Sequence, residues 1–297
     1  MRTCVVVAEE RPRVQLCNAF VKMLAPLGLT ARAVSTSFGA RVNAAICMQG
    51  ASSPDPSTLY VDVRALRNDR VTLVEKGAPH SIPLMESGKL LPGVKVVIAN
   101  PETKGQCADS HLGEIWVASS HNAAGYSIFG EETHLYTDHF NARLITGDTK
   151  TTFARTGYLG FLHQTQSINA EGELHDAVFV VGALDETIML RGMRYHPVDI
   201  ETTVIRSHKR ICESAVFTWT HLLVVVAETD AAETDALDLV PAITSAVLEE
   251  QHLIVGVVMI TDPATVPINS RGEKQRLHLR DAFLKDQLDP IYVAYNM

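Results

Sequence analysis

Long hydrophobic runs are missing from this sequence. Its longest nearly uninterrupted apolar stretches, Leu222–Ala227 and Leu253–Ile260, are far shorter than the roughly 20 residues that a membrane-spanning helix needs. The apolar run at the amino terminus, Cys4–Ala8, is too short for the core of a signal peptide and is followed at once by Glu9. We therefore expect a soluble chain without a transmembrane segment, in which Cys4–Ala8 forms a buried strand.

The sequence also lacks a paired cysteine motif. Its five cysteines are odd in number, lie far apart and include no C-x-x-C pair; they are Cys4, Cys17, Cys47, Cys107 and Cys212. This pattern favours reduced thiols in the cytoplasm over a disulfide framework, and it argues against a zinc site. His134 and Asp138 are at helical spacing and could ligate a metal, but we interpret them as surface residues. No metal site is predicted.

Positive charge is in deficit. The chain has 26 Lys and Arg against 34 Asp and Glu, a net charge of −8, so no global cationic field exists to hold nucleic acid or an anionic membrane. With 46% hydrophobic and 20% charged residues, the composition is that of an ordinary globular protein. A length of 297 residues leaves room for two packed domains.

Changes in local composition and hydrophobic pattern divide the chain into three segments and predict a mixed α/β fold. Residues 1–52 combine strand patterns at 4–8, 31–37 and 42–49 with a helical pattern over 13–25. Because the first strand has no partner before it, we expect the chain to begin inside a larger domain, as the end of its amino-terminal part. Residues 53–185 contain short apolar runs between Gly, Pro, Asn and Asp, which predicts a β-rich subdomain. Residues 186–297 predict a small α/β domain.

Within the two later segments, individual elements can be predicted. The apolar runs lie near 58–63, 71–75, 94–98 and 114–118, and a weak helical pattern covers 131–140. Pro197 suits the first turn of a helix that runs to about Ser207. Strands near 214–218 and 222–228 should join through a tight turn at Thr220 and His221, and helices should end near His252 and Leu284.

Three motifs follow one another along the chain. The first, FARTGYLGFL at 153–162, taken alone predicts a hairpin that turns at Gly157. The second is VGALDETIMLRG at 181–192, followed by YHPVDIE at 195–201. The third, VPINSRGEKQR at 266–276, taken alone is typical of a solvated loop, although a glycine turn among basic residues can also bind phosphate.

In this order and spacing the motifs resemble the late core motifs of the adenylate-forming, AMP-binding superfamily, and most closely its fatty acyl-AMP ligase branch. LPGV at 91–94, GEIWV at 113–117 and GY at 125–126 stand where that family has its β-rich subdomain. SFGA at 37–40 stands where the family has an aromatic-glycine segment that binds adenine. In detail, LRGMRYHPVDIE, PINSRGEKQRLHLRDAFL and QLDPIYVAYNM resemble the carboxy-terminal part of the disco-interacting protein 2 family.

This resemblance covers essentially the whole chain and implies both a fold and a chemistry. The fold would be the tail of a large α/β domain, a β-rich subdomain, and a small lid domain that rotates on a hinge at the second motif. The chemistry would use ATP and Mg²⁺ to convert a fatty acid into an acyl-adenylate and pyrophosphate. By resemblance, the nucleotide-binding residues are Phe38, Gly39, Arg155, Thr156, Gly157 and Tyr158. The hinge residues are Glu186, Arg191 and Gly192.

The sequence departs from the family pattern at the charged positions that this chemistry needs. Tyr158 stands where the family has an aspartate for the ribose hydroxyls, and a phenol cannot accept two hydroxyl groups as a carboxylate can. The other departures are Ala183 for an arginine, Asp185-Glu186 for a Lys-Asp pair, Val42 for a metal-binding glutamate, and Glu273 for the catalytic lysine. Lys274 follows one residue later and, with Arg271 and Arg276, could replace that lysine if the loop shifted. The family's phosphate-binding loop has no counterpart in the chain and would belong upstream of it.

Two functional hypotheses remain. In the first, the chain is a fatty acyl-AMP ligase-like segment that acts in lipid metabolism, has degraded nucleotide-binding residues and is inactive alone. In the second, it is a non-catalytic module that binds a lipid, an adenylate or a protein partner. The intact Arg155-Thr156-Gly157 frame favours the first hypothesis, whereas Tyr158, Ala183 and Glu273 favour the second. Both imply a fatty acid or acyl-adenylate ligand, the upstream part of the same protein as a partner, and no nucleic acid.

Overall fold

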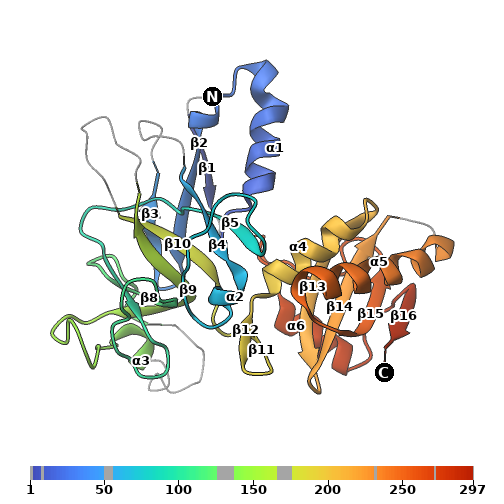
Figure 1. Cartoon of the computed structure of the whole chain (residues 1–297). Helices are drawn as coiled ribbons and strands as arrows, with labels where there is room; N and C mark the ends of the chain where they lie inside the picture. Colours follow the sequence, from blue (N-terminus) through green and yellow to red (C-terminus); the bar gives the residue numbers. More distant parts are fainter. Residues whose placement is uncertain are drawn as a thin grey trace. The chain divides into compact units, whose positions relative to one another are not determined.

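The computed structural model describes residues 3–7, 10–49, 56–125, 137–165, 176–230, 233–270 and 272–296. The chain forms two compact units, Met1–Asp185 and Glu186–Met297 (Figure 1). Both units combine helices with β-sheets, and the predicted α/β class is confirmed. No helix in the described ranges is both long and apolar enough to cross a membrane.

The first unit is built on one eight-stranded sheet. Its strands, in spatial order, are β1 (Cys4–Val7), β2 (Val34–Ala40), β3 (Asn43–Met48), β6 (Lys89–Leu90), β10 (Asp176–Ala183), β9 (Ala154–Gln164), β8 (Gly113–Ala118) and β7 (Lys95–Ala99). Only β1 and β2 are parallel, whereas the later pairs are antiparallel. Because β3 pairs with β6, the sheet is continuous between the segments 1–52 and 53–185.

Shorter elements surround this sheet. They are the helices α1 (Val14–Leu24), α2 (Val63–Leu66) and α3 (Thr137–Phe140), the 3-10 turns η1 (Ala25–Leu27) and η2 (Ala31–Ala33), and the paired strands β4 (Thr58–Asp62) and β5 (Ser81–Met85). The helix predicted over 13–25 is confirmed in α1. The strand predicted from residue 31 begins three residues later, after η2. Of the helix predicted over 131–140, only α3 lies within the described residues.

The first motif is not a hairpin, and this prediction is wrong. Residues Ala154–Gln164 form the single strand β9, which pairs with β8 on one side and β10 on the other. Gly157, the residue at which the sequence predicted a turn, has a positive φ of +77°, but it lies within a continuous strand whose register shifts nearby against both neighbouring strands. The strand predicted over 71–75 is also wrong, because this segment contains only an isolated bridge from Leu73 to Val61.

The second unit contains a four-stranded sheet packed against helices. The strands, in spatial order, are β13 (Ile211–Trp219), β14 (Leu222–Thr229), β15 (Val255–Thr261) and β16 (Tyr292–Tyr295). The helices are α4 (Pro197–Ser207), α5 (Glu233–Gln251) and α6 (Arg276–Leu284), and a separate hairpin joins β11 (Ile188–Leu190) to β12 (Met193–Tyr195).

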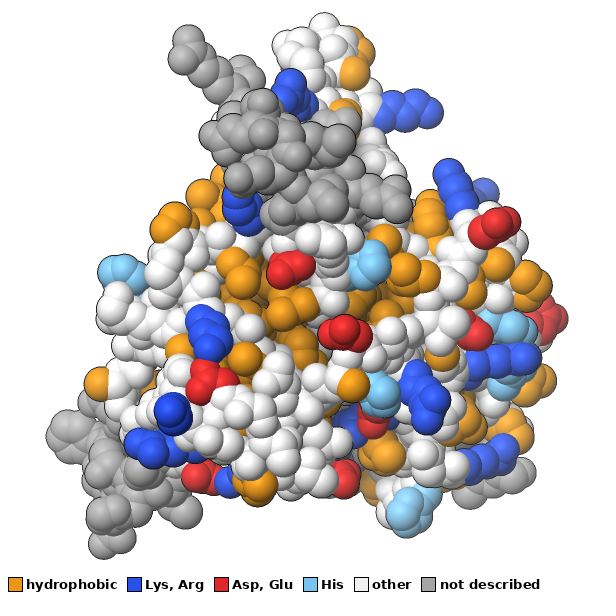
Figure 2. Space-filling model, turned by 60° about the vertical axis from the view of Figure 1, so that its left-hand side comes forward, with side chains coloured by type: hydrophobic (Ala, Val, Ile, Leu, Met, Phe, Trp, Pro, Cys, Tyr) orange, Lys and Arg blue, Asp and Glu red, His pale blue; other side chains and the backbone are white. Residues whose placement is uncertain are grey.

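Apolar residues that alternate along these strands form the core of the second unit. Val225 and Ala227 of β14 face the cluster that includes Ile200 and Val204 of α4, and Val224 and Val226 face the opposite cluster beneath α6. The predicted turn between β13 and β14 is confirmed, with positive φ at both Thr220 and His221. On the face shown in Figure 2, Lys and Arg side chains lie among Asp and Glu side chains.

Candidate functional site

The first cluster of polar residues surrounds Glu114, which the sheet buries to 1% exposure. Its carboxylate accepts hydrogen bonds from Trp116 Nε1 at 2.9 Å, from Arg155 Nε at 2.9 Å and from the backbone N–H of Gly157 at 3.2 Å. A second Arg155 nitrogen lies 2.8 Å from the same carboxylate, as an ion pair. Glu114 therefore holds the side chain of Arg155 and the backbone of Gly157 in one arrangement.

The strand register explains why these residues meet. Glu114 and Trp116 are two residues apart on β8, so their side chains lie on the same face of the sheet. Arg155 is the cross-strand neighbour of Trp116 on β9, and its guanidinium carbon lies 5.7 Å from the centre of the indole ring. The sequence prediction did not include Glu114 as a site residue. A carboxylate next to buried apolar positions of a predicted strand was the one signal that could have revealed it.

A separate aromatic contact lies on the opposite face of the sheet. The rings of Phe38 and Tyr158 meet edge to face, with centroids 5.6 Å apart and an angle of 81° between their planes. Phe38 is fully buried, and Tyr158 packs against the same apolar cluster. The Thr156 hydroxyl donates to Ile115 O at 2.7 Å and accepts from the backbone N–H of Tyr158 at 3.1 Å, which fixes the strand beside the ring.

Of the six residues that the resemblance implies for nucleotide binding, four are consecutive on β9, and Phe38, which Gly39 follows directly, contacts Tyr158. The side chain of Arg155 lies with Trp116 on the face of the sheet opposite to that of Phe38 and Tyr158. A Cβ atom added at Gly39 would lie 2.0 Å from Ala44 O, so only glycine permits this close approach of two strands. Of the residues predicted to depart from the family pattern, Ala183 is paired with Tyr158 across β10 and β9, and Val42 is buried in the apolar cluster of Phe38.

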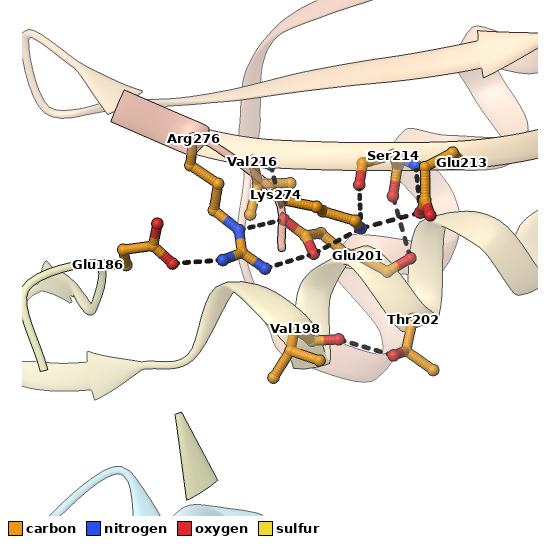
Figure 3. A network of polar contacts seen from close by, with 9 residues as sticks. All are labelled: Glu186, Val198, Glu201, Thr202, Glu213, Ser214, Val216, Lys274 and Arg276. Atoms are coloured by element: carbon orange, nitrogen blue, oxygen red, sulfur yellow. Dashed lines mark hydrogen bonds and ion pairs between the residues drawn. The ribbon is translucent and has the colours of Figure 1, made fainter. Parts of the chain in front are cut away.

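The second cluster is a buried ionic network in the second unit (Figure 3). Lys274 Nζ lies 2.9 Å from a carboxylate oxygen of Glu201 and 2.8 Å from one of Glu213, and donates to Ser214 O at 2.5 Å. The side chains of Lys274 and Glu201 are 5% and 2% exposed. Because an ammonium group has three N–H donors, these three acceptors use all of them. Lys274 points into the core of its unit.

Arg276 extends this network to the beginning of the second unit. Its Nε lies 2.7 Å from one Glu201 oxygen and a terminal nitrogen lies 2.9 Å from the other, which is the two-pronged geometry typical of arginine and carboxylate. The remaining terminal nitrogen pairs with Glu186, the predicted hinge residue. The other two hinge residues, Arg191 and Gly192, form the tip of the β11–β12 hairpin with φ angles of +53° and +76°.

Glu273 belongs to a small hairpin of its own. Its backbone N–H donates to Asn269 Oδ1 at 3.0 Å, and its carboxylate accepts from Asn269 Nδ2 at 2.6 Å. Of the other predicted residues, Asp138 pairs with Lys104 on the surface, whereas His134 and Arg271 lie outside the described residues. No group of three metal-ligating side chains occurs among the described residues.

Burial and charge shift the pKa of several groups. Burial alone would raise the pKa of Glu201, but the adjacent cations of Lys274 and Arg276 outweigh it and lower this pKa to about 2. In the first unit, burial raises the pKa of Glu86 to about 7 and that of the Cys47 thiol to about 12. Glu201 is therefore held as a carboxylate, whereas the environment of Glu86 favours the neutral acid.

Comparison with known proteins identifies the family of the chain. Residues 185–292 match the family model described as Disco-interacting protein 2-like, AMP domain. The chain is 69% identical to mouse Disco-interacting protein 2 homolog A over 298 residues and 59% identical to Drosophila melanogaster Disco-interacting protein 2 over 350 residues, and both alignments include 100% of this chain. The chain belongs to the disco-interacting protein 2 family. It spans 20% of the length of each of these two relatives.

Solved structures relate this disco-interacting protein 2 segment to adenylate-forming enzymes in fold. A structure from work on fatty acyl-adenylate ligases of E. coli and L. pneumophila matches 96% of this chain and 47% of its own, with a TM-score of 0.78 and 18% identity. A medium-chain-fatty-acid–[acyl-carrier-protein] ligase of Moorena producens is 29% identical over 94% of this chain and 47% of its own length. These matches support the prediction of a fatty acyl-AMP ligase-like domain and confirm its partial fold.

Proposed function

We propose that this segment keeps the fatty acyl-AMP ligase-like fold as a binding module in lipid metabolism and does not itself form acyl-adenylate. One observation supports this proposal most strongly. Lys274, the nearest candidate for the missing catalytic lysine, has all three of its N–H donors engaged within the core of the second unit. A lysine used in this way has no donor left for a phosphate.

The other cation that could replace the lysine is equally engaged. Arg276 is shared between Glu201 and Glu186, and releasing it would remove this cation from Glu186 and leave the buried carboxylate of Glu201 with Lys274 alone, which is costly. Because these buried contacts would have to break, the one-residue loop shift that would bring Lys274 to a ligand is disfavoured. Without such a shift a donor is missing from the reacting centre, and removal of one preorganised donor there typically costs roughly 10²–10³ in rate.

The aromatic cluster supports retention of a binding role. Phe38 and Tyr158 are in contact, and Glu114 fixes the side chain of Arg155 on the other face of the same sheet. The ligand that fits this proposal is a fatty acid or an acyl-adenylate. A solved fatty acyl-adenylate ligase from L. pneumophila in complex with acyl adenylate and pyrophosphate covers 99% of this chain with a TM-score of 0.52 and 23% identity.

Two measurements test the proposal. Calorimetry of the chain with a non-hydrolysable acyl-adenylate mimic is expected to give micromolar affinity, and absence of binding heat would leave only a scaffolding role. In the full-length protein, pyrophosphate release that depends on ATP and fatty acid is expected to stay at background. Release well above background would overturn the proposal that the segment does not form acyl-adenylate.

The departures from the family pattern provide the gain-of-function test. Reverting Tyr158→Asp, Ala183→Arg and Glu273→Lys together in the full-length protein should raise adenylation if these residues are the cause of inactivity. The matched control combines the same number of substitutions at exposed positions, such as Glu75→Asp, Glu102→Gln and Lys285→Arg. An unchanged rate in the triple revertant would contradict our account of the loss.

A further inference from the structure

Among the described residues, β13 is an edge strand of the second unit, because the sheet order β13-β14-β15-β16 gives it β14 as its one strand neighbour. In an antiparallel pair, the N–H and C=O groups of alternate residues point away from the partner. On an edge strand these outward groups form a template to which another chain can pair. The groups that bind the outward side of β13 therefore affect whether the chain stays monomeric.

Two outward groups of β13 are bound by side chains from elsewhere in the unit. Ser214 O accepts a hydrogen bond from Lys274 Nζ at 2.5 Å, and the N–H of Val216 donates to Glu201 Oε1 at 3.1 Å. A second strand paired antiparallel about Ala215 would bond to these same two groups. Lys274 and Glu201 thus provide one donor and one acceptor at the positions where a neighbouring strand would provide them.

All hydrogen-bond donors of Lys274 and all acceptor positions of Glu201 are in use, so the pair leaves no buried polar atom without a partner. Lys274 uses its third donor on Glu213, and the carboxylate of Glu201 accepts two hydrogen bonds from Arg276 in addition to its bonds from Lys274 and Val216. A carboxylate has about four acceptor positions, and all are in use. If the pair served charge neutralisation alone, contact with two backbone groups of one strand would be unnecessary.

We propose that Lys274 and Glu201 together take the place of a neighbouring strand along β13 and keep this edge closed to a second copy of the chain. The two residues come from different elements, the loop before α6 and helix α4, and they meet only at this edge. This role does not depend on the proposed ligand of the first unit.

The decisive variant is Lys274→Met, which keeps an unbranched stem but removes the donor to Ser214 O. Glu213→Gln is the matched control, since it changes another partner of Lys274 and leaves both contacts to β13 in place. Amide exchange across 211–219 and the mass measured by sedimentation equilibrium over a range of concentrations are the two readouts.

In Lys274→Met we expect exchange in β13 to rise by about tenfold or more, relative to β14 and β15, and the mean mass to increase with concentration. Glu213→Gln should match the unaltered protein in both measurements. The proposal is overturned if Lys274→Met exchanges like the control or keeps a constant mass.

A measurement on the unaltered protein covers the case in which this variant does not fold. The amide of Val216 should then exchange as slowly as that of Val225 on the inner strand β14, even though β13 is an edge strand. Rapid exchange at Val216 would overturn the proposal by itself.

Discussion

The ammonium group of Lys274 lies 2.9 Å from the carboxylate of Glu201 in the interior of the second unit. The two residues are 73 positions apart in the sequence, and both side chains are almost fully buried. Such a pair contributes little when compared with an apolar pair of the same shape, but removal of one partner leaves an uncompensated buried charge. The stability of the second unit should therefore depend strongly on each member.

Glu201→Gln should destabilise the second unit by about 3–5 kcal/mol, because two buried cations lose their shared carboxylate. Glu250→Gln is the matched control on the neighbouring surface, where the ion pair with Arg206 is half-exposed and should be worth about 1 kcal/mol or less. The two tryptophans, Trp116 and Trp219, lie one in each unit. Fluorine NMR of fluorotryptophan-labelled protein during urea unfolding would thus separate the units. Equal losses for both variants would contradict this prediction.

The acid stability of the second unit should follow the titration of Glu201. Its pKa is lowered from 4.5 to about 2 in the folded state, so its contribution to stability is fully present above about pH 4.5 and is lost as the pH falls toward 2. We expect urea midpoints of the second unit to decline across this window. In Glu201→Gln the decline should be smaller. A decline of the same size in the variant would assign it to other groups.

Glu86 should give the first unit a pH dependence of the opposite sign. Burial raises its pKa from 4.5 to about 7, so the folded state favours the protonated acid. The associated stability is present below pH 4.5 and is lost as the pH rises through about 7. Glu86→Gln removes this titration, so the urea midpoint of the first unit should fall less between about pH 5 and pH 8 in the variant than in the unaltered protein. An unchanged slope would show that Glu86 is not the titrating group.

Glu114→Gln should weaken the first unit by roughly 2–4 kcal/mol, because Arg155 loses its buried counterion and one acceptor oxygen becomes a donor facing other donors. Lys104→Met removes a surface ion pair with Asp138 and serves as the control, with a loss of about 1 kcal/mol or less. If the acyl-adenylate mimic binds at this cluster, its affinity should fall in Glu114→Gln and stay constant in Lys104→Met. Calorimetry of both folded variants checks this.

Local sequence signals predicted many elements well, and they erred where long-range pairing changed their meaning. Pro197 and the apolar spacing after it located α4, and the polar pair Thr220-His221 located the turn between β13 and β14. Gly157 was interpreted as a turn, yet it lies within β9, because pairing with β8 and β10 continues across the register shifts around it. The hairpin β11–β12 and strand β16 were not predicted, because both are short and gain their stability from packing.

The sequence by itself determined the family and the α/β class, because these depend on residue type and order along the chain. Tertiary structure alone decided that Phe38 meets Tyr158 and that Lys274 is held by Glu201 and Glu213. These contacts join residues far apart in sequence, and their geometry follows from strand register and helix packing, which no local pattern encodes. Lys274 could therefore look like a displaced catalytic residue in the sequence, whereas in the fold its charge is part of the core.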